Sequence, residues 1–494
     1  MADNNQQRQQ YSPFAEGHRP PRRGYLTRAA EELGLAALYH CPRDVKLLCL
    51  QRFVRLFAYG GSTLVLVAYL EALGISKTRI GLFMTLTLAG DVCISFLLTL
   101  FADGIGRKAI LALGAALMAG SGVVFALFED YWVLLAAAVF GVISPSGNEI
   151  GPFRAIEESI VAHLTTSASR GDVYAWYSLI GTAGTAFGMV TTGWVIHALQ
   201  GGQWVLVDAY RAVFVGYAVL GVVKLLFTLM LSGKVESEKK QAQGQQQTGE
   251  RAPLLSGGNG DNNGGASEDD QVKHRRSGWR TLLPEISRES RLVMVNLCIL
   301  FALDSFASGL APLSWVAYFF RSRYNLEEGK LGSVFFVTSI ISAASMLLAS
   351  ALAKRFGNVN TMVFTHLPSA IFLALIPIPN EVHWSLLFLV LRACTQSMDV
   401  APRSAFLAAI VLPAERTAIM GLVNVVKTSA QSLGPTLTGL LADRGLFWVA
   451  FVCAGSLKGC YDLGLLAVFK GHEREKAERE RLEAERRAAD EEGH

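Results

Sequence analysis

The chain has 494 residues, of which 51% are hydrophobic and only 17% are charged, and its mean hydropathy is positive at +0.33. Soluble domains carry about 25% charged residues, so this composition is typical of a membrane protein. The formal net charge of +4 is small, and the basic residues lie mainly in tails and short loops. No nucleic-acid partner is therefore expected, and lipid surrounds most of the chain.

Apolar runs long enough to cross a bilayer, roughly 17–25 residues each, recur outside the two ends and a central gap. We predict about twelve transmembrane helices and an all-α membrane protein. The predicted helices lie near 51–73, 80–101, 109–128, 131–163, 174–198, 208–232, 293–319, 330–352, 359–378, 383–411, 418–441 and 446–469.

Three polar segments flank and separate two groups of six predicted helices, 51–232 and 293–469. Residues 1–50 form a polar, basic N-terminal arm without the apolar stretch of a signal peptide. Residues 233–292 are rich in Gln, Gly, Asn and charge and form a disordered linker. Residues 470–494 alternate Glu and Arg at helical spacing and form a charged tail. The even helix number predicts that all three segments lie on one side of the membrane, and the bases Arg107, Lys108, Lys354 and Arg355 on that side predict that it is the cytosol.

The linker contains the stretch ERAPLL, in which Glu250 precedes Leu254 and Leu255. This spacing resembles the acidic dileucine signal that vesicle-coat adaptors bind in accessible, unfolded segments. Such a signal predicts a vacuolar or lysosome-like membrane. The alternative is a chance match and a protein of the plasma membrane.

The two halves repeat each other at a nearly constant offset. FAYG at 57–60 matches FASG at 306–309, Pro152 matches Pro402, and Glu149 matches Asp399 at an offset of 250. Parallel six-helix repeats are typical of transporters that rock one half against the other around a central site.

A polar stretch, FADGIGRKAIL at 101–111, interrupts the apolar sequence between the second and third predicted helices. It resembles the signature G-x-x-x-D-(R/K)-x-G-(R/K)-(R/K) of the major facilitator superfamily. The matching residues are Asp103, Gly106, Arg107 and Lys108, whereas Thr99 and Gly104 depart from the signature. The second half has Lys354, Arg355, Phe356 and Gly357 at the equivalent place, without the acid.

This resemblance implies two pseudo-symmetric six-helix bundles, the major facilitator fold, in a monomeric secondary transporter. It also implies that Asp103 belongs to a conformational switch that latches the inner ends of the halves. The alternative for this stretch is an ordinary positively charged cytosolic loop. A further element, GPTLTG at 434–439, is similar to a motif of the family's antiporters, although glycines at this spacing also form close helix contacts.

Ionisable and polar groups inside predicted spans are the candidates for substrate or proton binding. The fourth span carries Asn148 and Glu149 between Pro145 and Pro152. The tenth span places four polar residues on one helix face: Arg392, Gln396, Asp399 and Arg403. The alternative for Asp399 is an ion pair with Arg403 one turn later. We expect the equivalent acids of the two halves to line the central cavity.

Further candidates lie in the remaining spans. Arg55 and Asp304 occupy equivalent positions, which leaves two alternatives: they pair across the cavity, or Arg55 extends to the cytosolic headgroups. Lys427 and Asp91 are also candidates for substrate or proton binding. Lys458 is expected to pair with Asp462 four residues later. The other polar residues are expected at a solvated cytosolic face or the interface: Arg154, Glu157, Glu158, Arg170, His163, His197 and His366.

These features together predict the transport of a small-molecule substrate by alternating access, coupled to a gradient, with protons as the coupling ion. No ATP-binding loop, catalytic triad or metal-ligand cluster is present in the sequence, so we expect no enzyme, no cofactor and no metal site. A transporter-like nutrient sensor that signals without net transport is the alternative. The sequence does not distinguish import from export.

Overall fold

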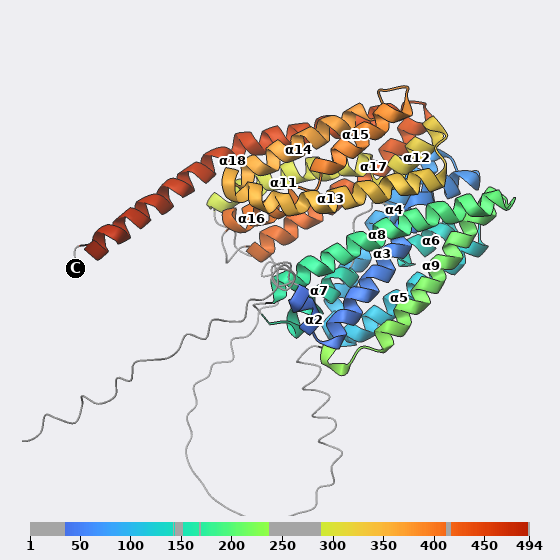
Figure 1. The fold of residues 1–494 in the computed structure, drawn as a ribbon, viewed down its shortest axis with the longest axis horizontal. Coiled ribbons are helices and arrows are strands. Elements are labelled where there is room, and N and C mark those ends of the chain that lie inside the picture. Colours follow the sequence, from blue (N-terminus) through green and yellow to red (C-terminus); the bar gives the residue numbers. More distant parts are fainter. Residues whose placement is uncertain are drawn as a thin grey trace, which may run out of the picture.

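The computed structural model describes residues 35–141, 143, 152–166, 169–236, 288–411 and 416–492, and its regular structure there is helical (Figure 1). The first half comprises α2 (Leu35–His40), α3 (Arg43–Ala72), α4 (Lys77–Ile105), α5 (Arg107–Leu127), α6 (Tyr131–Gly141), α7 (Pro152–Leu164), α8 (Arg170–Gly201), α9 (Leu206–Leu229) and the 3-10 turn η1 (Gly233–Val235). The second half comprises α11 (Arg288–Leu310), α12 (Leu313–Tyr324), α13 (Glu328–Phe356), α14 (Asn358–Leu375), α15 (Val382–Thr395), α16 (Val400–Ile410), α17 (Arg416–Asp443) and α18 (Phe447–Glu492).

Every predicted span contains helix, but the fourth, seventh and tenth are not single helices as expected. They are α6 with α7, α11 with α12, and α15 with α16. Proline explains two of the interruptions. Pro312 directly precedes α12, and Pro402 lies in the first turn of α16, where a missing backbone N–H costs no helical hydrogen bond.

The helices also extend beyond the predicted ranges at several ends. Residues 35–40 and 43–50, expected in the N-terminal arm, are helical. The start of α3 is attached to the end of the first half, because the carboxylate of Asp44 accepts hydrogen bonds from the backbone N–H of Ser232, at 3.0 Å, and from its hydroxyl. The charged tail continues α18 as a helix to Glu492.

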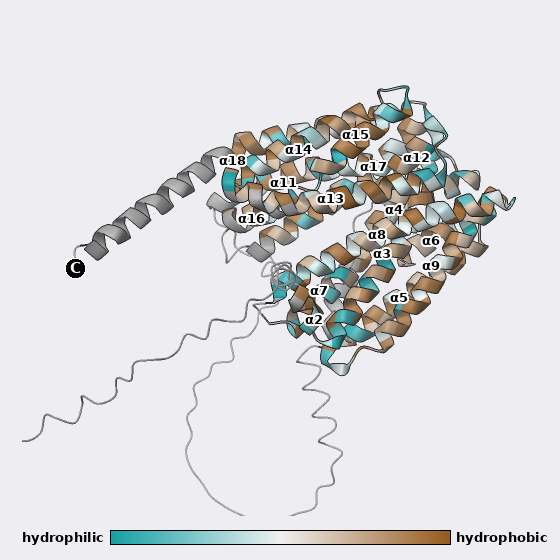
Figure 2. Cartoon of the chain, in the orientation of Figure 1, coloured by the Kyte–Doolittle hydropathy of each residue, from teal (hydrophilic) through white to brown (hydrophobic). Residues whose placement is uncertain are grey.

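Seven described helical stretches are long and apolar enough to cross a membrane, and two shorter apolar helices, Tyr131–Gly141 and Val382–Thr395, accompany them. Apolar residues dominate α5, α9 and α14 (Figure 2). Their outward side chains include Leu127, Val219 and Phe364, which are 70%, 56% and 69% exposed. Such an apolar outer surface suits lipid contact, and the number of twelve crossings stays a prediction.

The two halves share a hydrophobic core at one end only. We call the end where α9 finishes and α11 begins the linker end, and the opposite end the closed end. At the closed end a single core includes Tyr69 and Phe125 of the first half and Trp315 and Phe451 of the second. Toward the linker end each half has its own core, as the diverging halves in Figure 1 suggest.

Among the residues whose side chains are described, the hydrogen bonds between the halves also lie toward the closed end. Asp443 at the end of α17 accepts hydrogen bonds from the backbone N–H groups of Lys77 and Thr78, at 3.1 and 2.9 Å, and so caps α4 of the other half. The hydroxyls of Thr436 and Thr85 lie 2.7 Å apart. The phenol of Tyr210 donates to Glu328 at 2.8 Å.

Glycine allows the backbones to approach closely at two contacts between the halves, that of α4 with α17 and that of α8 with α13. A Cβ on Gly81 of α4 would lie 2.4 Å from the carbonyl oxygen of Pro435 in α17, and a Cβ on Gly332 of α13 would lie 2.5 Å from that of Met189 in α8. The repeat places Gly81 and Gly332 at equivalent positions. GPTLTG is therefore a close-packing element here, because Gly434 also lies against the backbone of Gly309.

Loss of the Asp443 cap should loosen the closed end. We expect Asp443→Ala to raise the labelling rate of an introduced Thr436→Cys by up to about fivefold, because a helix cap contributes about 1 kcal/mol. The measurement uses maleimide labelling of purified protein in which the exposed Cys93, Cys453 and Cys460 are replaced by alanine.

The matched control is Asp130→Ala. Asp130 caps α6 through the N–H groups of Trp132 and Val133, at 2.9 and 3.0 Å, within one half. Equal labelling rates in the two variants would contradict a role of Asp443 in joining the halves.

Candidate functional site

A polar cavity of about 470 Å³ lies between the halves. Thr182, Thr185 and Met189 of α8 contribute the lining from the first half, and helices of the second half contribute the rest. A cavity of this size is within the range of small-molecule sites.

The interrupted helices of the second half meet at this cavity. Pro312 and Leu313 at the start of α12 line it, as do Asp399 and Val400 at the start of α16. Backbone that leaves helical geometry at membrane depth needs a cavity or polar neighbours. The breaks therefore explain why polar side chains gather here.

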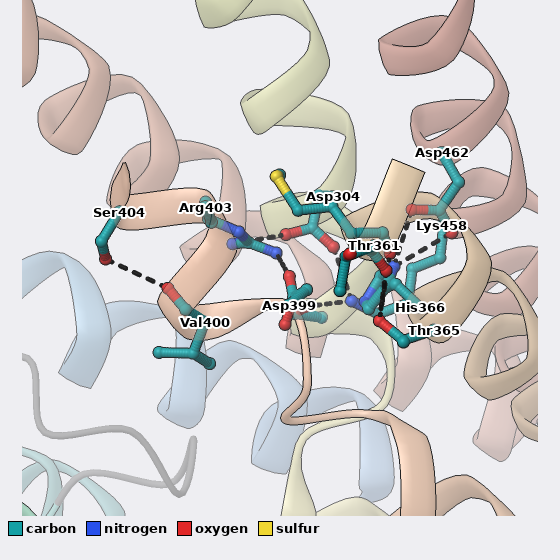
Figure 3. Close-up of polar contacts among 12 residues, drawn as sticks. Asp304, Thr361, Thr365, His366, Asp399, Val400, Arg403, Ser404, Lys458 and Asp462 are labelled. Carbon is teal, nitrogen blue, oxygen red and sulfur yellow. Dashed lines mark hydrogen bonds and ion pairs between the residues drawn. The ribbon is translucent and has the colours of Figure 1, made fainter. Parts of the chain in front are cut away.

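Asp304 of α11 is the centre of the charge network (Figure 3). Its carboxylate accepts from the ammonium of Lys458 at 2.6 Å, and the guanidinium of Arg403 lies 3.4 Å away. Arg403 also binds the carboxylate of Asp399, and Lys458 donates to the hydroxyl of Ser308 at 2.8 Å. The two carboxylates and two bases form one buried cluster from α11, α16 and α18.

The expected pair between Lys458 and Asp462 is wrong. Asp462 instead lies 3.0 Å from Nδ1 of His366, while Lys458 binds Asp304. Residues four apart on α18 point to different neighbouring helices here, since α14 and α11 each offer a partner. His366 is 4% exposed and so is buried within α14 and not interfacial as expected.

The expected pair between Arg55 and Asp304 is also wrong. Arg55 of α3 binds Glu157 of α7 at 2.6 Å, within its own half. Tyr177 donates its phenolic O–H to the same carboxylate, and Lys224 lies 3.8 Å from it. Glu157 is fully buried and does not belong to a solvated face, because four helices of the first half converge on it.

Arg154 and Glu158 behave differently from Glu157. They pair with each other at 2.7 Å, one turn apart and partly exposed. The guanidinium of Arg170 donates to backbone carbonyls at the end of α7. Sequence reasoning missed Tyr177 and Lys224 of the Glu157 cluster, although Lys224 is a base well inside the sixth predicted span.

Arg392, Gln396 and Lys427 line the cavity. The amide of Gln396 donates to the hydroxyl of Ser342 at 2.9 Å. The ammonium of Lys427 lies 5.4 Å from the ring centre of Phe301. The guanidinium of Arg392 has a buried Nε without a hydrogen-bond partner, and neither base forms an ion pair within the described residues.

Asp91 of α4 is a further buried acid. It is 2% exposed, and neither carboxyl oxygen has a hydrogen-bond partner. A buried carboxylate without a partner is costly, whereas the protonated acid is neutral. Asp91 is therefore the described acid with the least support for a negative charge.

The signature loop is described in part. α4 runs through Gly104, and Gly106 alone makes the turn, with φ of 109°. The backbone N–H groups of Arg107 and Lys108 donate to Glu236, at 2.9 and 3.3 Å. Several predicted residues, or their side chains, lie outside the described part: Asp103, Asn148, Glu149, Glu250, Leu254 and Leu255.

Comparisons with known proteins agree with this architecture. A family model described as Major Facilitator Superfamily matches residues 48–435 and, in a second alignment, 297–490. The uncharacterized membrane protein YJR124C of Saccharomyces cerevisiae is 36% identical over 441 residues, which cover 87% of this chain and 94% of that protein.

Two solved structures share the fold. A point mutant of the nucleoside transporter NupG gives a TM-score of 0.65 at 14% identity, covering 86% of this chain and 100% of that chain. The inward-open xylose transporter XylE from E. coli gives 0.61 at 14% identity, covering 86% and 96%.

The match to the family model, together with the helical fold and the central polar cavity, identifies a membrane transporter of small solutes. The chain belongs to the major facilitator superfamily, which confirms the predicted family and fold class.

The Asp304 cluster predicts a specific pattern of stability. Asp304→Asn should lower the free energy of unfolding by about 3–5 kcal/mol, because it leaves Lys458 buried without its charge partner. Adding Lys458→Met should recover part of this loss, since the unpaired charge is then gone. Thermal unfolding of the purified variants measures both effects.

Asp130→Asn serves as the control for an acid outside any ion pair in the described structure. If the double variant is no more stable than Asp304→Asn, Lys458 does not depend on Asp304.

Proposed function

We propose that the protein carries a small solute across its membrane by alternating access, with protons as the coupling ion. The observation that carries this proposal is the cavity of about 470 Å³ between the halves, which adjoins a shared core at the closed end only. A carrier that rocks around a central site needs one end joined while the other is apart.

The contacts at the closed end suit a reversible opening. Gly81 against Pro435 and Gly332 against Met189 bring the backbones of the two halves into direct contact. When these contacts separate, the linker ends would approach each other and expose the cavity to the other side. The loop with Asp103, Gly106, Arg107 and Lys108 lies at the linker end, where a latch for that second state is required.

Asp91 supports proton coupling most directly among the described acids. Asp399 pairs with Arg403, and Asp304 pairs with Lys458 and Arg403. Asp91 has no such partner and can take up or release a proton as its surroundings change between states. Glu149 stays a second candidate, equivalent by the repeat to Asp399.

The membrane in which the protein acts is part of the proposal. Glu250, Leu254 and Leu255 favour a vacuolar or lysosome-like membrane, where the lumen is acidic and a proton gradient is available. The arm, the linker and the tail are proposed to be cytosolic, and the protein to act as a monomer.

The test of coupling uses protein reconstituted in vesicles with an imposed pH gradient and a panel of labelled solutes. Wild type should accumulate its solute under the gradient. Asp91→Asn should lose this accumulation while it keeps solute exchange at equal pH, because the proton site is neutralised and the cavity is intact.

Asp130→Asn is the matched control and should behave as wild type. Gradient-driven accumulation by Asp91→Asn at the wild-type rate would contradict the role of Asp91. Solute binding without any flux in wild type would favour the sensor, which binds a nutrient and signals without transport.

The membrane location has its own test. A fluorescent fusion of wild type should label internal acidic compartments, whereas Leu254→Ala with Leu255→Ala should shift the fusion to the cell surface. An identical surface distribution of both proteins would contradict the sorting signal.

A further inference from the structure

The bases and acids that line the cavity are unequal in number. In addition to His366, which contacts Asp462, two arginines and two lysines of the second half line it: Arg392, Arg403, Lys427 and Lys458. Among the residues that the structure describes, two carboxylates line it: Asp304, which pairs with Arg403 and Lys458, and Asp399, which pairs with Arg403. Asp462 lies behind the lining against His366 and does not reach the remaining two bases. Arg392 and Lys427 therefore form no ion pair among the described residues.

Arg392 is held in place without a polar partner. It lies in the last turn of α15, its Nε is buried, and the guanidinium donates no hydrogen bond within the described structure. A guanidinium presents a planar set of donors that matches carboxylate and phosphate oxygens. An arginine without hydrogen-bond acceptors inside a membrane span raises the free energy of the folded protein, unless a ligand or water accepts its hydrogen bonds.

Lys427 lies close to another positive charge. Its ammonium and the guanidinium of Arg403 are each 5.4 Å from the ring centre of Phe301. An aromatic ring attracts both cations but does not neutralise them. An anion beside Lys427 would relieve the repulsion between the two bases.

The interrupted helices add to the positive potential. The N-terminal ends of α12 and α16, marked by Leu313 and Val400, line the same cavity. Helix N-termini carry partial positive charge and unsatisfied N–H groups, and both favour anions. Hydroxyl and amide groups in the lining, including Ser342 and Gln396, can contact the other polar groups of the ligand.

We propose that the solute is a small organic anion whose carboxylate or phosphate group binds Arg392 and Lys427. This inference rests on the proposed transport function and adds the charge class of its substrate. Arg392 binds the oxygens as a planar pair of donors, and Lys427 supplies the second positive charge. A cavity of about 470 Å³ accepts a solute of metabolite size.

The test measures thermal stabilisation of the purified full chain by matched pairs of solutes at low and high chloride. One pair is succinate with succinamide, and the other is glucose 6-phosphate with glucose. We expect at least one anion to raise the Tm and its neutral twin to have no effect. The two pairs distinguish a carboxylate from a phosphate ligand.

Two variants test the binding residues. Arg392→Gln and Lys427→Met should each weaken anion binding at least about tenfold, because a charge-assisted contact is lost. Arg392→Gln should also raise the Tm of the ligand-free protein, since it removes a half-buried charge that has no ion-pair partner within the described structure. A residue with a merely structural role would lower that Tm.

The matched controls are Arg444→Gln and Lys330→Met, whose side chains lie at the exposed closed end. Both controls should bind the anion as wild type does. Equal stabilisation by a neutral twin, or wild-type anion affinity in Arg392→Gln, would overturn the inference. Stabilisation by chloride alone would overturn it as well, because the site would then hold only an inorganic ion.

Flux in vesicles separates this inference from the transport function. If an anion binds through Arg392 but does not cross the membrane, the transport proposal fails and the inferred ligand class stands. If a neutral solute crosses equally well in wild type and Arg392→Gln, transport stands and the inferred ligand class fails.

Discussion

A charged side chain at membrane depth requires an opposite charge, water or a ligand, and the two halves meet this requirement differently. In the first half, Glu157 forms an ion pair with Arg55 and lies 3.8 Å from Lys224. In the second half, Asp304 and Asp399 neutralise Arg403 and Lys458. The first cluster holds helices of one bundle together, whereas the second forms the wall of the cavity.

This difference gives the halves distinct roles around one site. The first half contributes threonines and a methionine of α8 to the lining. The second half contributes the charges and the interrupted helices, so the chemistry of recognition lies mainly on that side. Because the cavity adjoins the contact between the halves, the proposed closure at either end would change what its charged groups face. That coupling of position to electrostatics is what a carrier requires.

The helical architecture was predictable from the sequence because lipid requires long apolar segments. The repeat also relates each segment of the first half to an equivalent segment of the second half. Glycines at equivalent places, Gly81 and Gly332, were visible in the repeat and do lie at equivalent contacts. The interruptions at Pro312 and Pro402 were not predicted, because periodicity does not separate one bent span from two short helices.

The partners of charged residues were less predictable. Local spacing favoured Lys458 with Asp462, and the repeat favoured Arg55 with Asp304, but contacts between helices decided both cases. Arg403 with Asp399 was weighed as a local pair and is formed. Spacing along one helix identifies neighbours on that helix only, whereas Glu157 gathers its partners from three other helices.

Two pairs of exposed residues would report the motion of the halves most directly. Ile105 and Phe356 lie at the linker end, and Trp132 and Trp384 lie at the closed end, one of each pair in each half. Spin labels are attached at these sites in protein that lacks its exposed native cysteines. Pulsed electron paramagnetic resonance then measures the distance within each pair. The alternating-access account predicts that a change in pH or the addition of a bound solute shortens one distance and lengthens the other. Two distances that stay constant, or that change in the same direction, would contradict it.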